Sequence, residues 1–156
     1  MKAAKTPALI VRNPRASHDY AIEERLTAGL VLEGWEVKSL RQKRAHLKES
    51  YALIKGGEAW LIGAHITPLP DCSPQSGAQP TRTRKLLLNR REIAHLTGLV
   101  ERKGYTLVPL KMYWQKNRAK LELGVGRGKQ AHDKRADERR REWEREKRRL
   151  AGRLAH

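Results

Sequence analysis

Apolar and polar residues alternate most regularly in two segments of the chain, residues 105–114 and 118–126. A period of two is typical of a half-buried β-strand, so one face of the first segment would carry Val108, Leu110, Met112 and Trp114. The inward face of the second would carry Ala119, Leu121, Leu123 and Val125, with Lys120 and Glu122 outward. Residues 115–117 join the two strands into a predicted hairpin, in which Pro109 indicates an edge position or a bulge.

A second hairpin is predicted where the apolar segments 50–55 and 58–66 flank Gly56 and Gly57. Two glycines between two apolar runs are typical of a tight two-residue turn. Residues 19–32 carry both strand and helix signals, and the β-branched and apolar residues at their ends favour a strand.

Two segments carry helical signals. Residues 33–43 place Val37 and Leu40 three positions apart, and residues 89–104 place Ile93, Leu96 and Val100 on one face. Asn89 is a suitable N-cap and Gly104 a suitable stop. Several short antiparallel strands with two small helices predict a mainly β fold, and an OB-type barrel with flanking short helices is one candidate.

The remaining long segment, residues 67–85, holds four of the seven prolines and is predicted to be a loop. Cys72 is the only cysteine, which excludes an internal disulfide and a multi-cysteine zinc site. The six histidines lack a metal-ligand spacing, so we expect no metal and no cofactor.

The net charge of the chain indicates which kind of partner it binds. The chain has 34 Lys and Arg against 17 Asp and Glu, a net charge of +17, which would attract a polyanion such as nucleic acid. A basic protein on a membrane surface is the alternative, but no apolar run approaches the roughly 18 residues of a membrane span. The first 15 residues also lack the apolar core of a signal peptide. We therefore expect a soluble, cytoplasmic protein that does not bind membranes.

The densest basic segment before the C-terminal region is residues 81–91, with five cations. If it is extended, Arg82 and Arg84 share one face, about 7 Å apart, and Lys85 lies on the other, which suits a phosphate backbone. In the first predicted helix, Lys38 and Arg41 are neighbours three positions apart and form a second ridge for phosphates. A solvated surface that only aids solubility is the alternative interpretation.

Glu36 and His18 are ambiguous from the sequence. A carboxylate beside a phosphate-binding ridge either pairs with a nearby cation or accepts a hydrogen bond from a base amino group, and both remain open for Glu36. His18 with Asp19, or with Glu23 and Glu24, resembles a weak acid/base pair, but such pairs arise by chance in charged sequences. No catalytic motif supports it, and the sequence predicts a binding protein, not an enzyme. With only four Trp, four Tyr and no Phe, structured RNA is favoured over single strands.

The chain divides by composition. Residues 1–128, the predicted barrel with an N-terminal arm, hold 23 Lys and Arg against 11 Asp and Glu; residues 129–156, the tail, hold 11 against 6. Opposite charges three positions apart in the tail favour a helix, but Ala136, Trp143 and Leu150 give one apolar residue per two turns. We expect a tail that is disordered when free and becomes helical against a charged surface.

Four motifs, in this order and spacing, resemble the small protein B family of bacterial trans-translation: GWEVKSLR (34–41), PTRTRKLLL (80–88), KGYTLVPLKMYW (103–114) and GRGKQAHDKR (126–135). The resemblance runs from about residue 8 to the end. It implies a six-stranded OB-type barrel that binds the tRNA-like domain of transfer-messenger RNA, also called SsrA RNA, without enzymatic activity. It also implies delivery of that RNA to stalled ribosomes, where the tail becomes helical in the empty mRNA channel. Elongation factor Tu and alanyl-tRNA synthetase would be indirect partners of a monomer.

The resemblance also assigns residues. On residues 1–128 it implies an RNA-binding face of Asn13, Lys38, Arg41, Arg82, Arg84, Lys85, Leu87 and Asn89, to which we add His18 and Glu36 as candidates. The ribosome-binding tail would comprise Lys129, His132 at the decoding centre, Asp133, Lys134, Arg135, Arg139, Arg140, Trp143 and Leu150. Thr27 stands where the family usually has Glu. An architectural ribosomal protein is the alternative function, and an RNA-processing enzyme a distant third.

Overall fold

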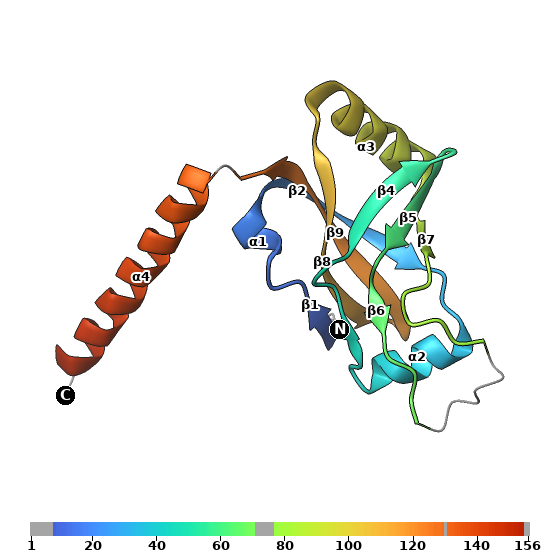
Figure 1. Ribbon diagram of the computed structural model, residues 1–156, viewed down its shortest axis with the longest axis horizontal. Helices are drawn as coiled ribbons and strands as arrows, with labels where there is room; N and C mark the ends of the chain where they lie inside the picture. Colours follow the sequence, from blue (N-terminus) through green and yellow to red (C-terminus); the bar gives the residue numbers. More distant parts are fainter. Residues whose placement is uncertain (1–7, 71–76, 130, 155–156) are drawn as a thin grey trace, which may run out of the picture.

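The computed structural model describes residues 8–70, 77–129 and 131–154. Its elements in chain order are β1 (Ala8–Arg12), α1 (Ala16–Asp19), β2 (Tyr20–Leu30), α2 (Gly34–Arg41), β3 (Ala45–His46), β4 (Tyr51–Lys55), β5 (Glu58–Ile62), β6 (His65–Ile66), β7 (Arg84–Leu87), α3 (Arg90–Lys103), β8 (Thr106–Gln115), β9 (Arg118–Gly128) and α4 (Ala131–Leu154). The strands curl into a barrel, and α4 extends away from it as a single long helix (Figure 1).

The strands of the described residues close into a ring. Antiparallel pairs run in the order β8-β4-β5-β7-β2-β9, and β9 pairs again with β8. β1 lies outside this ring and pairs with the second half of β8. Six strands in a closed ring place β7 opposite β8, so side chains on the outer faces of these two strands lie on opposite sides of the molecule. This confirms the expected six-stranded barrel.

Both predicted hairpins form. β4 and β5 are joined by Gly56 and Gly57 with φ of 64° and 73°, the left-handed backbone that the tight turn requires. β8 and β9 are joined by Lys116 and Asn117 with φ of 49° and 63°. Within the predicted segment 19–32, residues Tyr20–Leu30 form β2, which confirms the strand over the helix.

The predicted irregularity at Pro109 is a bulge. The register between β8 and β9 shifts between Pro109 and Lys111, so one extra residue sits in β8. The bulge reverses the side-chain phase: Leu107 before it and Met112 after it both belong to the core. The prediction that Val108 and Leu110 share a face with Met112 was therefore wrong, because an uninterrupted period of two does not cross a bulge.

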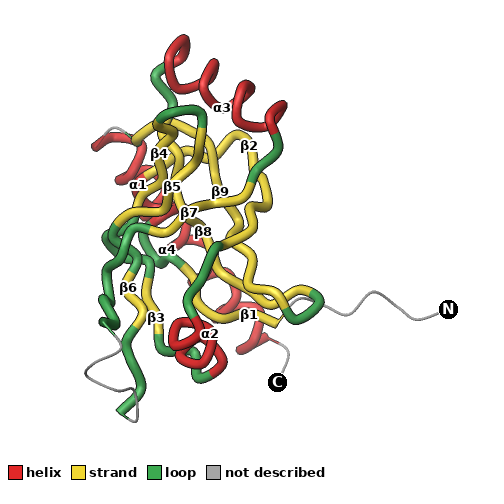
Figure 2. The backbone as a smooth tube through the Cα atoms, turned by 90° about the vertical axis from the view of Figure 1, so that its right-hand side faces the viewer, coloured by secondary structure: helices red, strands yellow, loops and turns green. Residues whose placement is uncertain are grey.

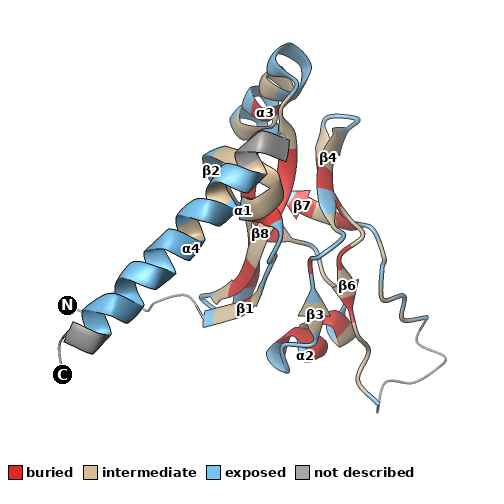
Figure 3. Ribbon diagram, turned by 60° about the vertical axis from the view of Figure 1, so that its left-hand side comes forward, coloured by how far each residue is buried: buried red, intermediate tan, exposed pale blue. Residues whose placement is uncertain are grey.

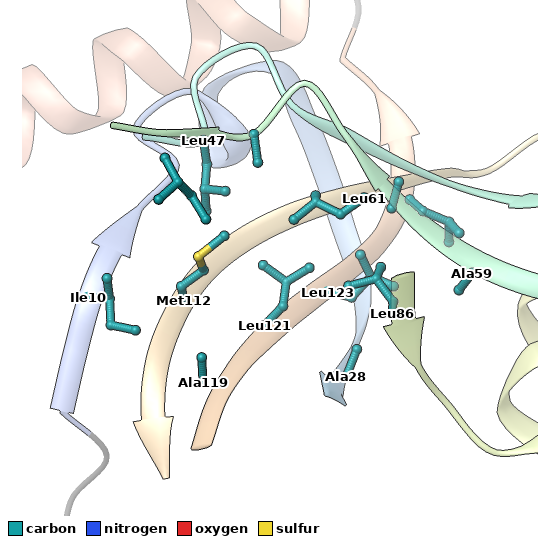
Figure 4. Packing of buried hydrophobic residues seen from close by; sticks show 14 of the residues in the cluster. Ile10, Ala28, Leu47, Ala59, Leu61, Leu86, Met112, Ala119, Leu121 and Leu123 are labelled. Carbon is teal, nitrogen blue, oxygen red and sulfur yellow. The ribbon is translucent and has the colours of Figure 1, made fainter. Parts of the chain in front are cut away.

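The core fills the inside of the ring (Figure 4). β9 contributes the four residues predicted for its inner face, and Leu61, Leu86 and Met112 meet them from β5, β7 and β8. Each fully buried Leu contributes about 1.5–3 kcal/mol relative to an exposed one. Burial of this set fixes the orientation of the strands and, through them, of the outward-facing polar residues.

Helix α3 covers one end of the barrel (Figure 2). It begins as predicted with a capping box, in which Asn89 Oδ1 accepts from the Glu92 amide at 2.8 Å, and it ends at Gly104 with φ of 66°. Leu96 is buried and Leu99 packs on the core. Val100, predicted on the buried face, is 38% exposed.

Three small features were not predicted: β1, α1 and the two-stranded β3–β6 ribbon. The proline-rich segment is a loop in its described parts, but it ends two residues earlier than predicted because Arg84 begins β7. Cys72 lies outside the described residues. Within the described parts of the chain, no helix is long and apolar enough to span a membrane.

Candidate nucleic-acid interface

The predicted RNA-binding residues fall on two sides of the barrel. Lys85 and Leu87 lie on β7, and Lys38 and Arg41 on α2 next to it, whereas Asn13 and His18 lie beside β8 and α1 (Figure 1). Figure 1 shows α1 on one side of the barrel and β7 on the other, although Arg41 of α2 reaches Trp114 near the end of β8. We call the two sides the α2–β7 surface and the α1–tail surface.

A buried carboxylate organises the α2–β7 surface. Glu36 is 0% exposed and receives three hydrogen bonds: from its own helix at the Glu33 amide (2.7 Å), from Arg82 Nη2 (2.5 Å) and from Arg84 Nε. The first closes a capping box, so the same side chain starts α2 and attaches it to the segment that leads into β7. Burial alone would raise the pKa of Glu36, but the hydrogen bonds from Arg82, Glu33 and Arg84 outweigh it and lower the pKa.

These contacts correct two assignments. Arg82 and Arg84 do share one face, but that face points inward, and the Arg84 side chain is 0% exposed. Its Nη1 donates to Ala64 O at 2.7 Å and its Nη2 to Pro80 O at 3.0 Å. Arg84 and Glu36 are therefore structural residues with no surface for RNA, and the ambiguity over Glu36 is resolved in favour of cation pairing.

Arg82 is intermediate between a structural residue and an RNA-binding residue. Its side chain is 26% exposed and contacts Glu36, Glu33 Oε1 at 3.2 Å and the Val31 carbonyl at 3.3 Å. A guanidinium so extensively engaged reaches a phosphate only by giving up one of these contacts.

Other side chains of the α2–β7 surface do reach solvent. Lys38 and Arg41 are exposed on α2, and the Arg41 guanidinium lies 5.6 Å from the Trp114 ring centroid, a cation–π contact that holds it at the surface. Lys85 points to the face opposite Arg84, as predicted, and bonds Glu58 at 2.8 Å. Leu87 is 52% exposed, and the exposed Asn89 follows it at the start of α3.

Asn13 has a clear structural role on the other surface. Its Nδ2 donates to Pro109 O at 2.9 Å, and its backbone amide donates to Leu110 O at 2.8 Å. Its Oδ1 accepts from the Arg15 amide at 3.2 Å. Asn13 thus ties the segment between β1 and α1 to the bulge of β8, which explains why an amide side chain is suited to this position.

The tail is attached to α1 by ion pairs. Lys129 Nζ donates to Ser17 O at 2.8 Å and pairs with Asp137, and Lys134 Nζ lies 3.3 Å from Asp19 Oδ1. His18 Nε2 bonds Glu138 Oε1 at 2.8 Å. We call these contacts the tail latch. Arg135 is exposed, and the side chains of His132 and Asp133 lie outside the described residues.

The tail latch favours a charged His18. Its Nδ1 bonds Asp19 Oδ1 at 2.9 Å, so both ring nitrogens face carboxylates, which only accept hydrogen bonds. The bond to Glu138 and then the bond to Asp19 raise the pKa of His18 above 6.5. In turn the bond to His18 lowers the pKa of Asp19 and of Glu138. Arg15 at 3.7 Å adds a further cation beside Asp19.

Beyond the latch, α4 is solvent-covered on nearly every side (Figure 3). Arg139 and Arg140 are exposed, Trp143 is 58% and Leu150 49% exposed, which agrees with the thin apolar stripe. The predicted helix is present over Ala131–Leu154. Disorder of the free tail stays a prediction.

Sequence reasoning missed the acidic partners: Glu33, Glu58, Asp137 and Glu138. For Glu36 a signal was available, because it lies four positions before the buried Leu40 and therefore on the same helix face. For the tail latch no signal existed, since its partners are 120 positions apart in the case of His18 and Glu138. Among the described residues, no group of three His, Cys, Asp or Glu side chains is arranged to hold a metal ion.

Comparisons with known proteins agree with this arrangement. The model of the SmpB protein family matches residues 10–153. The chain belongs to the SmpB family. It is 55% identical to the SsrA-binding protein of Coxiella burnetii (strain Dugway 5J108-111) over 149 residues, 94% of each chain. It is 56% identical to the SsrA-binding protein of Thiobacillus denitrificans over 147 residues, 94% of this chain and 99% of that one.

Among solved structures, this member of the SmpB family is similar to a chain described under "tmRNA-SmpB: a journey to the center of the bacterial ribosome". The TM-score is 0.64 and the identity 45%, over 77% of this chain and 84% of that chain. SmpB family proteins bind RNA.

Proposed function

We propose that this chain binds the tRNA-like domain of transfer-messenger RNA and delivers it to stalled ribosomes for trans-translation, with the tail entering the empty mRNA channel. The observation that carries the proposal is the 56% identity to an SsrA-binding protein across 99% of that protein's length. It acts by binding and not by catalysis, and through the charged RNA it meets elongation factor Tu and alanyl-tRNA synthetase indirectly. Since ribosomes are its proposed site of action, it would act in the cytoplasm, as a monomer.

The α2–β7 surface supplies contacts that RNA requires. Lys38 and Arg41 offer cations to phosphates, and Arg41 is oriented by Trp114. Leu87 offers an apolar side chain and Asn89 an amide at the adjacent helix start, where helix geometry also favours an anion. Phosphate contacts set affinity and its salt dependence, so this surface should bind less tightly as salt rises.

The tail supplies a ribosome probe. α4 has 24 residues, which corresponds to about 36 Å at 1.5 Å per residue, long enough to enter a channel. Its exposed Arg135, Arg139 and Arg140 suit ribosomal RNA phosphates, and Trp143 offers a ring for stacking. His132 would lie at the decoding centre, and Asp133 would belong with Lys134 and Arg135 to the family's tail motif.

The test compares the full chain with a chain that ends at Gly128. Binding to transfer-messenger RNA is measured against excess ordinary tRNA at two salt concentrations, together with peptide tagging on stalled ribosomes. The proposal expects the shortened chain to bind the RNA selectively and to fail in tagging. Equal binding of all RNAs by both chains would contradict it and favour an architectural ribosomal protein.

A further inference from the structure

The two-stranded β3–β6 ribbon places two histidines directly opposite each other. His46 pairs with His65 in the register of the ribbon, and their rings are stacked with centroids 4.7 Å apart and planes 3° apart. A histidine titrates close to neutral pH, so the charge of such a pair changes within the physiological range. The rings can stack while at least one of them is neutral, whereas two imidazolium ions at this distance repel each other.

The surroundings of the pair disfavour a second positive charge. Burial, then the charge of His46, then the charge of Arg84 lower the pKa of His65. β1 and α2, which pack on the ribbon, carry one carboxylate, that of Glu36, and Arg82 and Arg84 already bond it. The other charged side chains of β1, α2 and β7 are all cations: Arg12, Lys38, Arg41, Arg84 and Lys85.

No carboxylate compensates the charge of the pair. In the described parts of the chain neither ring bonds one, whereas His18 bonds Glu138 and His95 bonds Glu24. His65 Nδ1 lies 3.3 Å from Thr67 Oγ1. A hydroxyl donates to a neutral ring nitrogen and accepts from a protonated one, so this contact does not oppose a change of charge.

The ribbon also supports the buried pair that attaches α2 to β7. Arg84 Nη1 donates to the carbonyl of Ala64, the residue before His65, at 2.7 Å, and Arg84 Nη2 donates to Pro80 O at 3.0 Å. The amide of Ile66, the residue after His65, donates to the same Pro80 carbonyl at 2.9 Å. The ribbon lies beside α2 (Figure 2). A rearrangement at His65 therefore reaches Arg84 through both chain neighbours of this histidine.

We infer that the His46–His65 stack is a pH-sensitive switch of the α2–β7 surface. While at least one ring is neutral the ribbon is closed and holds Arg84; protonation of both rings opens the ribbon and loosens that surface. The response of the ribbon belongs to the chain whatever it binds, and only the weaker binding of transfer-messenger RNA that follows rests on the proposed function.

The sign of the response distinguishes this switch from the tail latch. Because the folded state disfavours protonation of His65, the ribbon is fully stabilised above pH 6.5 and loses this contribution as the pH falls through the lowered pKa. The raised pKa of His18 has the opposite effect, since it stabilises the tail latch in acid.

The first measurement is an NMR titration of the full-length protein from about pH 8 to about pH 5. It follows the histidine ring protons and the exchange of the Ile66 amide, corrected for the intrinsic pH dependence of exchange. His65 should take up its proton below pH 6.5, and the Ile66 amide should lose protection over the same interval. His46→Asn removes the neighbouring charge, so His65 should titrate at a higher pH in that variant. Protonation of His65 at or above pH 6.5 in the unchanged protein, or an Ile66 amide that stays protected once both rings are charged, would refute the switch.

The second measurement compares transfer-messenger RNA binding at about pH 7.5 and about pH 5.5, at one ionic strength. Protonation of the other histidines adds positive charge and strengthens RNA binding in acid, so the comparison is made with His46→Asn, whose exposed position keeps the fold intact as circular dichroism verifies. Relative to that variant, the unchanged protein should lose affinity in acid by up to about tenfold, the limit for one proton taken up over one pH unit. The matched control is His95→Asn, which removes an exposed histidine of α3 and should respond to pH as the unchanged protein does.

The switch and the proposed function fail separately. Equal pH responses of the unchanged protein and His46→Asn, in a protein that selects transfer-messenger RNA over tRNA, overturn the switch of the α2–β7 surface and leave the proposed function intact. Absence of that selectivity at about pH 7.5 contradicts the proposed function, whereas the titration of His65 and the exchange of Ile66 still decide whether the ribbon opens.

Discussion

Replacing Glu36 by Gln tests the interpretation that a buried ion pair attaches α2 to β7. The substitution keeps the shape of the side chain and one acceptor oxygen, but it removes the charge beside Arg84, and both side chains are 0% exposed. Loss of one partner of a buried pair costs about 3–5 kcal/mol, because the other charge stays buried without compensation. Since the amide still accepts a hydrogen bond and Arg82 keeps Glu33, we expect about 3 kcal/mol.

That cost is a large share of the stability of a domain, which is about 5–15 kcal/mol. Urea unfolding followed by tryptophan fluorescence measures it, with Trp35 in α2 and Trp114 in β8 as reporters near the site. In a thermal scan the same cost would lower Tm by about 6–12 °C. Glu58→Gln is the matched control: it breaks a pair with Lys85 whose side chains are 44% and 39% exposed, and we expect about 0.5 kcal/mol or less.

A double-mutant cycle tests the cause. If the loss of stability in Glu36→Gln arises because the buried charge of Arg84 is left unpaired, the same substitution should cost less stability in an Arg84→Met background. An equal cost in both backgrounds would show that Arg84 is not the reason. A cost of Glu36→Gln no greater than that of Glu58→Gln would refute the buried-pair interpretation altogether.

Three further substitutions have definite expected outcomes. Gly126→Ala should destabilise the barrel by about 1–3 kcal/mol or more in urea unfolding, because its Cβ would lie 1.9 Å from a β2 carbonyl oxygen, whereas Gly128→Ala, with open space around it, should be nearly neutral. Lys38→Ala with Arg41→Ala should weaken transfer-messenger RNA binding and flatten its dependence on salt, and an unchanged slope would remove both from the interface. The raised pKa of His18 stabilises the tail latch fully below pH 6.5 and loses that contribution as pH rises through the raised value, so spin-label distances between α1 and α4 should lengthen from pH 6 to pH 9. His18→Gln should remove this pH response, and a response that persists would assign it to another group.

The strands and turns of the barrel could be predicted because they depend on local signals. The Gly56–Gly57 pair and the alternation in residues 118–126 each specify an element without reference to the rest of the chain. The side-chain phase of β8 could not be predicted through Pro109. A bulge changes the face of every residue after it, and its position is decided by pairing with β9.

The cations of residues 81–91 show a second feature that the sequence could not predict. Period two correctly predicted that Arg82 and Arg84 point the same way, but not whether that way is outward. The local sequence does not distinguish an exposed cation from a buried cation that is paired with a carboxylate. Only the position of Glu36 in the fold shows which of the two each arginine is. Leu87 and Asn89 are exposed as the family resemblance implied, although nothing in their local pattern predicted it.

The tail latch also explains the mixed charge of the tail. Asp137 and Glu138 point their carboxylates at Lys129 and His18, while Arg135 and Arg139 stay exposed. Attachment to α1 thus uses tail residues of both signs, since Glu138 bonds His18, Lys134 pairs with Asp19 and Lys129 donates to Ser17 O, and it leaves Arg135 and Arg139 available for phosphates. A tail with cations alone would be repelled by the net positive charge of residues 1–128, and the bond between Glu138 and His18 offsets part of that repulsion where α4 begins.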